Sequence, residues 1–412
     1  MAAEPADFLS FEEARRVVEE HASRLRPRGR ELLGLLAASG RVLAEPIHAD
    51  RDFPPFPRAA RDGYAVHAAD LEKLPANLEV IGEIKAGASP AQIPQVARGQ
   101  SAAIMTGAAA PAGSDAVVMV EYTSPSGNRV EIARGVSTGE NIVPAGSEAK
   151  RSDLLIRPGA RVTYAEIAVA AAVGRSRLLV YAQPRVAVLS TGDEVVDVDV
   201  PPGPNQIRNS NTYSLAAQIQ AAGGDPVLLP IAPDELVRLR ELLKEGLEAD
   251  LLLIAGGVSM GKYDLVEPVL AEMQAEFFFT GAKIQPGKPI VFGQVPLSEN
   301  HRYFLGLPGN PTSTMVTFEL FARPMLEALA GMKVRQLTFL HARLKAAIQT
   351  KTGLTRFLPA SLTGEFASAE VELVRWQGSG DIAAVARANC YVVVPPDRQR
   401  IEAGAWVAVL QR

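Results

Sequence analysis

The feature that most constrains the fold is a strand–loop–helix rhythm over residues 184–331. Short apolar runs such as RVAVLS, PVLLPI and DLLLIA alternate with segments of helical spacing such as TYSLAAQIQAAGG and PDELVRLRELLKEGLEA. This alternation favours a parallel sheet, because a parallel crossover is usually made by a helix. We therefore predict an α/β domain with a doubly wound, mostly parallel sheet, whose last helix runs from Pro311 to about Leu329.

Helical patterns also mark the start of the chain. Ser10 and Glu13 have the spacing of a capping box, and the helical sequence FEEARRVVEEHASRL follows. The leucines of residues 32–36 extend this pattern, until the prolines of RDFPPFPRAARDGYAV end it. A further helical pattern covers residues 164–173. We expect these segments to form one helical domain that another domain interrupts.

Two other segments are rich in predicted β-structure. Between residues 78 and 151 the runs EVIGEIKAG, SAAIMTG, SDAVVMVEY and NRVEIAR alternate with Gly and Pro turns, as short strands do. After Gly331, turns such as TGEF, QGSGD and PPDRQ again separate short apolar runs. The predicted division is a discontinuous helical domain (1–50 with 150–183), an inserted β-rich domain (51–149), the α/β domain (184–331) and a C-terminal β-domain (332–412).

Composition excludes several classes of function. The 412 residues carry a net charge of −4, so we expect no nucleic acid partner. A single cysteine, Cys390, rules out an intrachain disulfide and fits a reducing compartment. The N-terminal sequence lacks the features of a signal peptide, and the most apolar stretch, residues 167–173, is too short to span a bilayer. We therefore expect a cytoplasmic protein that does not enter a membrane.

The metal-binding residue types point away from zinc. The histidines are scattered and no Cys-x-x-Cys is present. A bound metal would therefore be held by carboxylates, which favour a hard cation such as Mg²⁺.

Three loops rich in glycine, hydroxyl or carboxylate residues follow predicted strands of the α/β domain. They are STGDE (190–194), GGVSMG (256–261) and GLPGNPTST (306–314). In open α/β sheets, ligands bind beyond the carboxyl ends of the strands, so we expect the three loops to share one binding site. The alternative is that such loops only connect a strand to a helix.

The third loop indicates an anionic ligand. Gly309 permits a tight turn, and Pro311 suits the first turn of a helix. We expect the amides and hydroxyls of Thr312–Thr314 to bind phosphate or pyrophosphate at the helix N-terminus. NAD binding is not supported, because no G-x-G-x-x-G follows a strand, and GAKIQPGKP lacks the spacing and the hydroxyl of a phosphate loop.

An ordered set of motifs carries a resemblance to a known family. DGYAV, IMTGAAAPAGSDAVV, STGDEV followed by NSN, GGVSMGKYD, PGKP and GLPGNPTS occur in this order, and WQGSGDIAAVARAN follows them. The set resembles the molybdopterin molybdenumtransferase family, the MoeA type that includes the gephyrin E domain, over nearly the whole chain. The resemblance implies an elongated homodimer of four-domain subunits, with an α/β domain of the molybdopterin-binding type.

The resemblance also implies a reaction. Members of the family take adenylyl-molybdopterin and molybdate, cleave the adenylate, and release molybdenum cofactor and AMP, with Mg²⁺ as the expected helper. Their site lies in the α/β domain and faces the inserted β-domain of the other subunit. The upstream adenylyltransferase is a further expected partner.

Charged residues that match the family pattern are the candidates for this chemistry. Cleavage of a phosphoanhydride is assisted by a metal held by carboxylates, and lysines can pair with phosphate or molybdate oxygens. The catalytic candidates are Asp62, Glu148, Glu194, Asp234, Asp264, Lys283 and Lys288. Glu194 and Asp264 are the candidate Mg²⁺ ligands.

Most of these candidates have a structural alternative. Asp234 and Asp264 are both placed to cap a helix. Asp62 can pair with a neighbouring arginine, and Lys288 can be an ordinary solvated lysine. Glu194, at the end of a strand, is harder to explain by structure alone, which favours a function.

The substrate-binding candidates come from the three loops and from a predicted helix start whose side chains can hydrogen-bond the pterin or its phosphate. They are Thr191, Gly192, Asp193, Ser210, Asn211, Gly256, Gly257, Ser259, Gly261, Pro308, Gly309, Asn310, Pro311, Thr312 and Ser313.

The chain also departs from the family pattern. Arg61 precedes DGYAV where Met is usual, and Lys262 stands where an acidic residue is common. Gly281 and Gln285 occupy positions that are basic in some members. These departures leave open a non-catalytic molybdopterin-binding scaffold as an alternative to molybdenum insertion. A third alternative is the upstream molybdopterin adenylyltransferase, which resembles the α/β domain alone, although the extra domains and the GLPGNPTS loop fit it less well. The sequence does not distinguish molybdate from tungstate.

Overall fold

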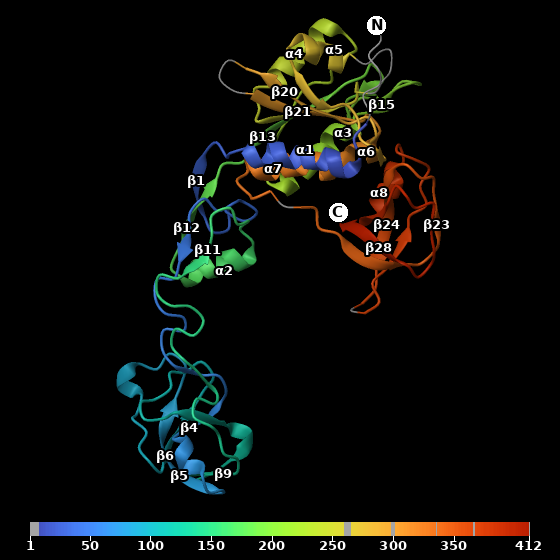
Figure 1. The fold of residues 1–412 in the computed structure, drawn as a ribbon. Helices are drawn as coiled ribbons and strands as arrows, with labels where there is room; N and C mark the ends of the chain where they lie inside the picture. The colour runs from blue at the N-terminus through green and yellow to red at the C-terminus, as the bar shows by residue number, and fades with distance from the viewer. Residues whose placement is uncertain (1–7, 259–264, 298–300, 335, 366, 412) are drawn as a thin grey trace. The chain divides into compact units, whose positions relative to one another are not determined.

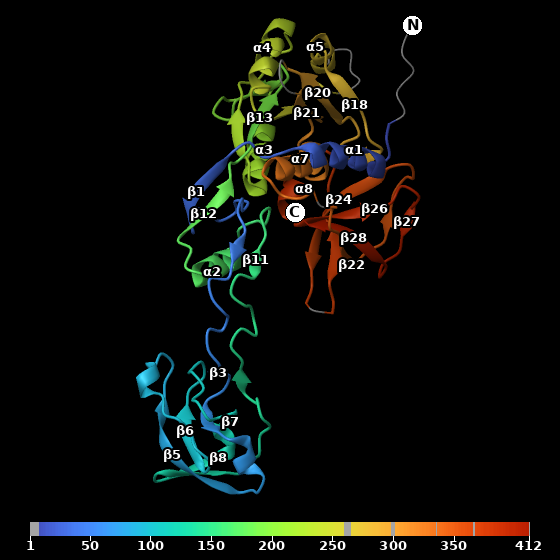
Figure 2. The ribbon, with the colours of Figure 1, turned by 60° about the vertical axis from the view of Figure 1, so that its left-hand side comes forward.

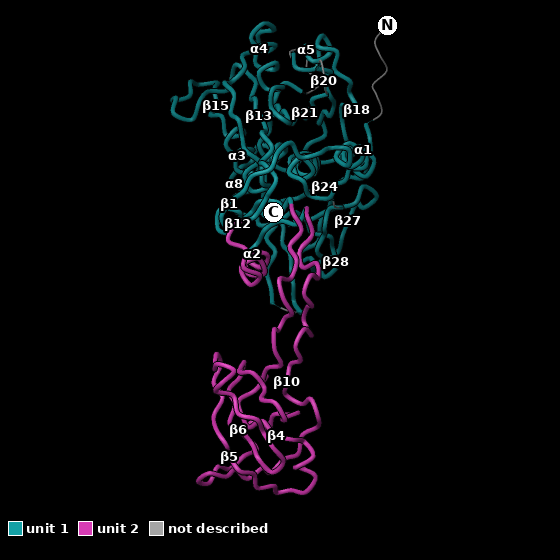
Figure 3. The backbone as a smooth tube through the Cα atoms, turned by 90° about the vertical axis from the view of Figure 1, so that its left-hand side faces the viewer, with its two compact units in different colours: residues 1–44, 159–163, 178–412 teal, residues 45–158, 164–177 magenta. Residues whose placement is uncertain are grey.

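The computed structural model describes residues 8–258, 265–297, 301–334, 336–365 and 367–411 (Figure 1). The chain divides into two compact units, coloured separately in Figure 3. Unit 1 consists of residues 1–44, 159–163 and 178–412, and unit 2 of residues 45–158 and 164–177. The finer division into four domains remains a prediction.

The central sheet of unit 1 has the predicted mostly parallel order. Its neighbouring strands are β16 (Asp225–Leu228), β13 (Arg185–Ser190), β17 (Leu251–Ala255), β21 (His301–Leu307), β20 (Val291–Pro296) and β18 (Glu276–Phe279). The strands from β16 to β21 are parallel, whereas β20 and β18 form an antiparallel edge. The predicted fold class is therefore confirmed.

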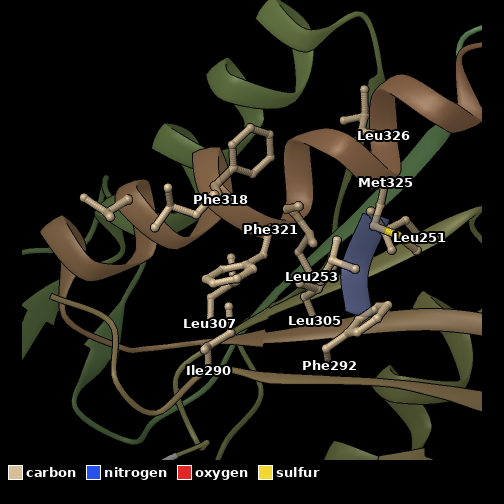
Figure 4. Close-up of a cluster of buried hydrophobic side chains, with 14 of the residues drawn as sticks. Leu251, Leu253, Ile290, Phe292, Leu305, Leu307, Phe318, Phe321, Met325 and Leu326 are labelled. Atoms are coloured by element: carbon tan, nitrogen blue, oxygen red, sulfur yellow. The ribbon is translucent and has the colours of Figure 1, made fainter. Parts of the chain in front are cut away.

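Helices cover both faces of this sheet, which explains why its central strands are unbroken apolar runs. One face packs against α1 (Phe11–Arg24), α3 (Ser210–Ala222), α6 (Pro311–Thr317) and α7 (Arg323–Leu329), and the other against α4 (Leu236–Gly246) and α5 (Val266–Glu272). Figure 4 shows side chains of the first core, including Leu253 and Leu305 from the sheet and Phe321 from the covering helix. The sheet is thereby fixed as a rigid platform for the loops at its edge.

The last helix of the α/β segment spans Pro311 to Leu329 as predicted, with a π-helical turn, η4 (Phe318–Ala322), between α6 and α7. Pro324 has no N–H to donate to the carbonyl of Leu320, which lies four residues earlier. The Arg15 side chain of α1 donates to that carbonyl instead. This bond helps to hold α1 beside α7, where Figure 1 shows the two helices.

The start of α1 confirms one sequence prediction, and the segment after it contradicts another. Ser10 and Glu13 form the expected capping box. The helical pattern predicted through residues 32–36 is wrong, because β1 (Arg30–Gly34) pairs with β12 (Arg177–Tyr181). Leu32 and Leu36 are 52% and 85% exposed, so no core receives a helical face there. Pairing with a strand distant in sequence has overridden local helix propensity.

The C-terminal residues form a barrel-like sheet (Figure 2). Its order is β19 (Ile284–Gln285), β24 (Thr355–Thr363), β25 (Glu370–Leu373), β22 (Leu340–Leu344), β28 (Trp406–Gln411) and β26 (Cys390–Val394), and β26 pairs with β24 to close it. A small pair, β23 (Ile348–Gln349) and β27 (Arg400–Ile401), and one short helix, α8 (Ile382–Arg387), accompany it. The predicted β-rich character of this segment is confirmed.

Unit 2 contains the β-rich segment predicted between residues 78 and 151. Its sheet has the order β7 (Ala116–Met119), β4 (Gly63–Val66), β6 (Gln100–Ile104), β5 (Ala76–Ile84), β9 (Arg129–Ile132) and β8 (Thr123–Ser126). Two short pairs, β2 (Ile47–His48) with β11 (Leu154–Ile156) and β3 (Arg58–Ala59) with β10 (Ile142–Val143), and the predicted helix α2 (Tyr164–Ala172) complete it. Within the described ranges of the chain, no helix has the length and hydropathy needed to cross a bilayer.

Candidate active site

A cavity of about 470 Å³ lies at the carboxyl ends of β13, β17 and β21, in unit 1. All three predicted loops contribute to its wall, because parallel strands end at the same edge of their sheet. The expectation that the loops share a site is therefore met by the geometry. The predicted residues that line the cavity are Thr191, Gly192, Glu194, Ser210, Asn211, Asp234, Gly256, Gly257, Pro308, Gly309, Asn310 and Pro311.

Two glycines allow the first loop to approach the second. Gly256 and Gly257 have φ of +97° and +65°, in the left-handed region. A Cβ atom on Gly256 would lie 2.9 Å from the carbonyl oxygen of Thr191, and one on Gly257 would lie 2.8 Å from Thr191 Oγ1. The Thr191 N–H donates to the Ala255 carbonyl at 3.1 Å, which ties the two strand ends together.

A buried polar network joins the end of β13 to the start of α3. Asn209, which is 4% exposed, is the N-cap of α3, and its Oδ1 accepts from the Thr212 N–H at 3.2 Å. The Ser190 hydroxyl lies 3.1 Å from Asn209 Oδ1 and 2.8 Å from Thr212 Oγ1, and Asn209 Nδ2 donates to Thr212 Oγ1 at 2.9 Å. The network places Ser210 and Asn211 at the cavity.

Two buried polar atoms on the cavity wall lack a hydrogen-bond partner among the described residues. They are Thr191 Oγ1 and Asn211 Oδ1. Asn211 Nδ2 donates to the Gly309 carbonyl at 2.8 Å, and because a carbonyl only accepts, this bond fixes the orientation of the amide. Asn211 therefore offers an acceptor, and Thr191 a hydroxyl, to a polar group that enters the cavity.

Charged side chains of both signs line the cavity. Glu194 and Asp234 are exposed carboxylates, and Arg208 is an exposed guanidinium whose Nε donates to the Val198 carbonyl at 3.0 Å. Asp234 is not a helix cap as the alternative supposed, because the N-cap of α4 is Glu235. The Asp234 N–H donates to Asp193 Oδ1 at 3.0 Å, so Asp193 supports the loop without lining the cavity.

Two of the three amides that were expected to bind an anion at Thr312–Thr314 are already engaged. The Thr312 N–H donates to the Ser379 carbonyl at 3.0 Å, and the Thr314 N–H to the Asn310 carbonyl at 3.0 Å. Thr312, Ser313 and Thr314 are buried, and none of them lines the cavity. The third loop lines the cavity with residues 308–311 instead.

Other predicted residues lie away from the cavity or outside the described residues. Lys283 and Lys288 are exposed and do not line it, and Lys288 Nζ is 4.9 Å from the centroid of the Phe8 ring. The predicted residues that fall outside the described part of the chain are Ser259, Gly261 and Asp264, together with the departure at Lys262.

Asp62 and Glu148 belong to unit 2. The Asp62 carboxylate accepts from the Thr106 N–H at 2.6 Å and from its hydroxyl at 2.9 Å. These bonds, the backbone one first, lower the pKa of Asp62 below its usual value. Arg58, one of the two arginines considered as a partner of Asp62, pairs with Glu148 instead, at 2.9 Å.

The predicted Mg²⁺ ligands lie in different parts of the chain. Among the residues that the structure describes, no group of three or more His, Cys, Asp or Glu side chains is placed to hold a metal ion. Of the two predicted Mg²⁺ ligands, Glu194 lines the cavity and Asp264 lies outside the described residues.

Sequence reasoning missed several residues of the wall. They are Ser190, Val195, Ile207, Arg208, Asn209, Ala255, Val258 and Pro289. Arg208 and Asn209 directly precede Ser210 and Asn211, which were predicted, so their place before a helix start was a usable signal. Val195 and Ile207 come from the short parallel pair β14 (Val195–Val196) and β15 (Ile207–Arg208), which no periodicity indicates.

Comparisons with known proteins cover almost the whole chain. The model of the MoeA N-terminal region (domain I and II) matches residues 9–174, that of a probable molybdopterin binding domain matches residues 187–328, and that of the MoeA C-terminal region (domain IV) matches residues 341–411. The cavity lies within the second match.

Individual relatives agree with these matches. A protein of Nostoc sp. named molybdopterin molybdenumtransferase is 36% identical over 92% of this chain and 88% of its own length. A Bacillus subtilis protein of the same name is 32% identical over 90% of this chain and 87% of its own length. The crystal structure of a molybdopterin biosynthesis moeA protein from Pyrococcus horikoshii matches with a TM-score of 0.77 and 25% identity, over 98% of this chain and 100% of that one.

Proposed function

The chain belongs to the molybdopterin molybdenumtransferase family, and from this premise we propose that it inserts molybdenum from molybdate into adenylyl-molybdopterin with release of AMP. It is thus a transferase of molybdenum cofactor biosynthesis. The observation that carries the proposal is the convergence of the three loops on one cavity in the molybdopterin-binding segment.

The size and chemistry of the cavity support this substrate. A volume of about 470 Å³ is in the range of small-molecule sites. A pterin carries N–H groups that can donate to Asn211 Oδ1, and a polar substituent can satisfy Thr191 Oγ1. The first turn of α3 presents the positive end of a helix dipole to the same space, which favours a phosphate.

The carboxylates of the cavity fit a bound Mg²⁺. Mg²⁺ in phosphate-transferring sites takes one or two protein carboxylates beside waters and substrate phosphates. Glu194, one of the two predicted ligands, lines the cavity together with Asp234, and Asp264 is the second predicted ligand. When bound, Mg²⁺ would neutralise charge on the phosphoanhydride as AMP leaves. Without a cation, these carboxylates would repel a polyanionic substrate.

The remaining predicted roles enter the proposal through the family resemblance. We assign Lys283 and Lys288 to molybdate or phosphate oxygens, and Asp62 and Glu148 to the site of the partner subunit in a homodimer. In Asp62 the hydrogen bonds from Thr106 favour the ionised carboxylate, the form that can bind a cation.

The test is AMP release by the purified protein with adenylyl-molybdopterin, molybdate and Mg²⁺. Wild type is expected to release AMP, and Glu194→Gln to lower the rate by on the order of 10- to 100-fold, since one charged contact is lost. Glu241→Gln is the matched control, because Glu241 is an exposed carboxylate of α4 that pairs with Arg238 and does not line the cavity.

The outcomes separate the proposal from its alternatives. No AMP from wild type, under conditions in which a known family member reacts, would refute it. Tight binding of molybdopterin without turnover would instead favour a scaffold. Formation of adenylyl-molybdopterin from ATP and molybdopterin would favour the adenylyltransferase.

A further inference from the structure

Anion binding in this cavity needs a source of positive charge other than the one predicted from the sequence. The amides of Thr312 and Thr314 are already donated to carbonyls. Three more loop amides also donate to backbone carbonyls. The Thr191 N–H donates to Ala255, the Gly192 N–H to Ala232, and the Gly256 N–H to Leu307. These five amides of the three loops are therefore engaged by the fold itself.

The charged side chains of the cavity wall indicate which residue supplies the positive charge. Among the described lining residues, Arg208 is the only one with a positively charged side chain, and it faces a space shared with the carboxylates of Glu194 and Asp234. Lys283 and Lys288 are exposed and are not among the lining residues, although Lys288 directly precedes Pro289, which is one of them.

The position of Arg208 suits the binding of a phosphate. Its Nε–H is held by the Val198 carbonyl at 3.0 Å, which anchors the guanidinium plane and leaves its two terminal amino groups for another acceptor. Arg208 lies two residues before Ser210, the first residue of the thirteen-residue helix α3, so its charge adds to the positive end of that helix.

The neighbours of Arg208 suit an apolar ring. Ile207, 57% exposed, and Val195 belong to the paired strands β15 and β14, and both line the cavity. A large aliphatic side chain exposed on a cavity wall offers apolar surface that a heteroaromatic ring would cover.

Resting on the proposed function, we infer that Arg208 is the residue that positions the substrate by pairing with a phosphate of the pterin nucleotide, while Val195 and Ile207 pack against its ring. Arg208 acts on binding, because a phosphate held equally in the ground state and the transition state lowers KM without raising kcat. The guanidinium of Arg208 supplies an anion contact that the engaged amides of Thr312 and Thr314 do not supply.

The experiment measures KM and kcat for adenylyl-molybdopterin in wild type, Arg208→Ala and Arg208→Lys. Arg208→Ala is expected to raise KM about 10- to 100-fold, the range for one lost charge-assisted contact, with kcat changed less than about threefold. Arg208→Lys keeps the positive charge but cannot form two parallel hydrogen bonds to a phosphate, so its KM is expected to lie between those of wild type and Arg208→Ala. Added salt is expected to raise the KM of wild type more than that of Arg208→Ala.

Arg238→Ala is the matched control, because Arg238 is an exposed arginine of α4 that pairs with Glu241 and does not line the cavity. A KM of Arg208→Ala within about twofold of wild type would overturn the inference. If wild type itself releases no AMP, the proposed function fails, and calorimetric titration with inorganic pyrophosphate then decides the role of Arg208. Weaker pyrophosphate binding by Arg208→Ala supports the anion site, and equal binding overturns it.

Discussion

Asn209 links the sheet to the wall of the cavity, and its replacement tests whether this link is what positions α3. In Asn209→Ala, the Thr212 N–H loses its cap, which costs about 1 kcal/mol. The buried bonds to Ser190 Oγ and Thr212 Oγ1 are lost as well, but these two hydroxyls keep each other as partners at 2.8 Å. The loss of these two side-chain hydrogen bonds of Asn209 adds about 1 kcal/mol more, so we expect the free energy of unfolding to fall by about 2 kcal/mol in total.

The measurement is urea unfolding followed by far-UV circular dichroism, compared with wild type. Asn209→Ser, which keeps a capping oxygen but lacks the amide donor, is expected to lose about half as much. Asn205→Ala, at an exposed position of the preceding loop, is the control and is expected to leave the unfolding midpoint unchanged. An Asn209→Ala protein as stable as this control would refute the view that the buried network holds α3 in place.

Three further predictions follow from individual contacts. Gly257→Ala places a Cβ 2.7 Å from Val266 Cγ2 at a φ of +65°, so we expect the free energy of unfolding to fall by about 1–3 kcal/mol and the melting temperature to fall with it. Gly380→Ala, whose Cβ would enter open space, is the control and should not lower the melting temperature. Equal melting temperatures of the two variants would contradict the packing argument. Thr106→Val removes one of the hydrogen bonds that lower the pKa of Asp62, so ¹³C NMR titration should show that this pKa rises. Because the pKa of Asp62 is depressed in the folded protein, the stabilisation by this contact is present above the ordinary carboxyl pKa and is lost as pH falls through the folded value. An unchanged titration of Asp62 would contradict this cause. Burial raises the pKa of the Cys390 thiol to about 11, so at pH 8 a thiol reagent should react with it only after denaturant is added, and fast reaction of the native protein would contradict its burial.

The parts of the fold that local sequence specifies were predicted well. The capping box of α1 acts over a few residues, and the buried strands β13 and β17 are recognisable as apolar runs. The shared cavity also followed from the sequence, because the ends of parallel strands meet at one edge whatever the loops contain.

The errors came from contacts between distant residues. Nothing near Thr312 indicates that its amide bonds to Ser379, which lies in a turn 67 residues further along the chain. Likewise, β1 became a strand only because β12 lies beside it. Arg208 was missed for a related reason, since its place on the wall depends on the pairing of β14 with β15 across a loop without regular spacing.

The central claim is that the cavity at the ends of β13, β17 and β21 is where the pterin nucleotide binds. The most direct measurement is a crystal structure of the protein with adenylyl-molybdopterin. We expect ligand density in this cavity, with a phosphate against Arg208 and a polar group of the ligand on Asn211 Oδ1. Well-defined ligand bound elsewhere on the protein, with this cavity free of it, would contradict the account.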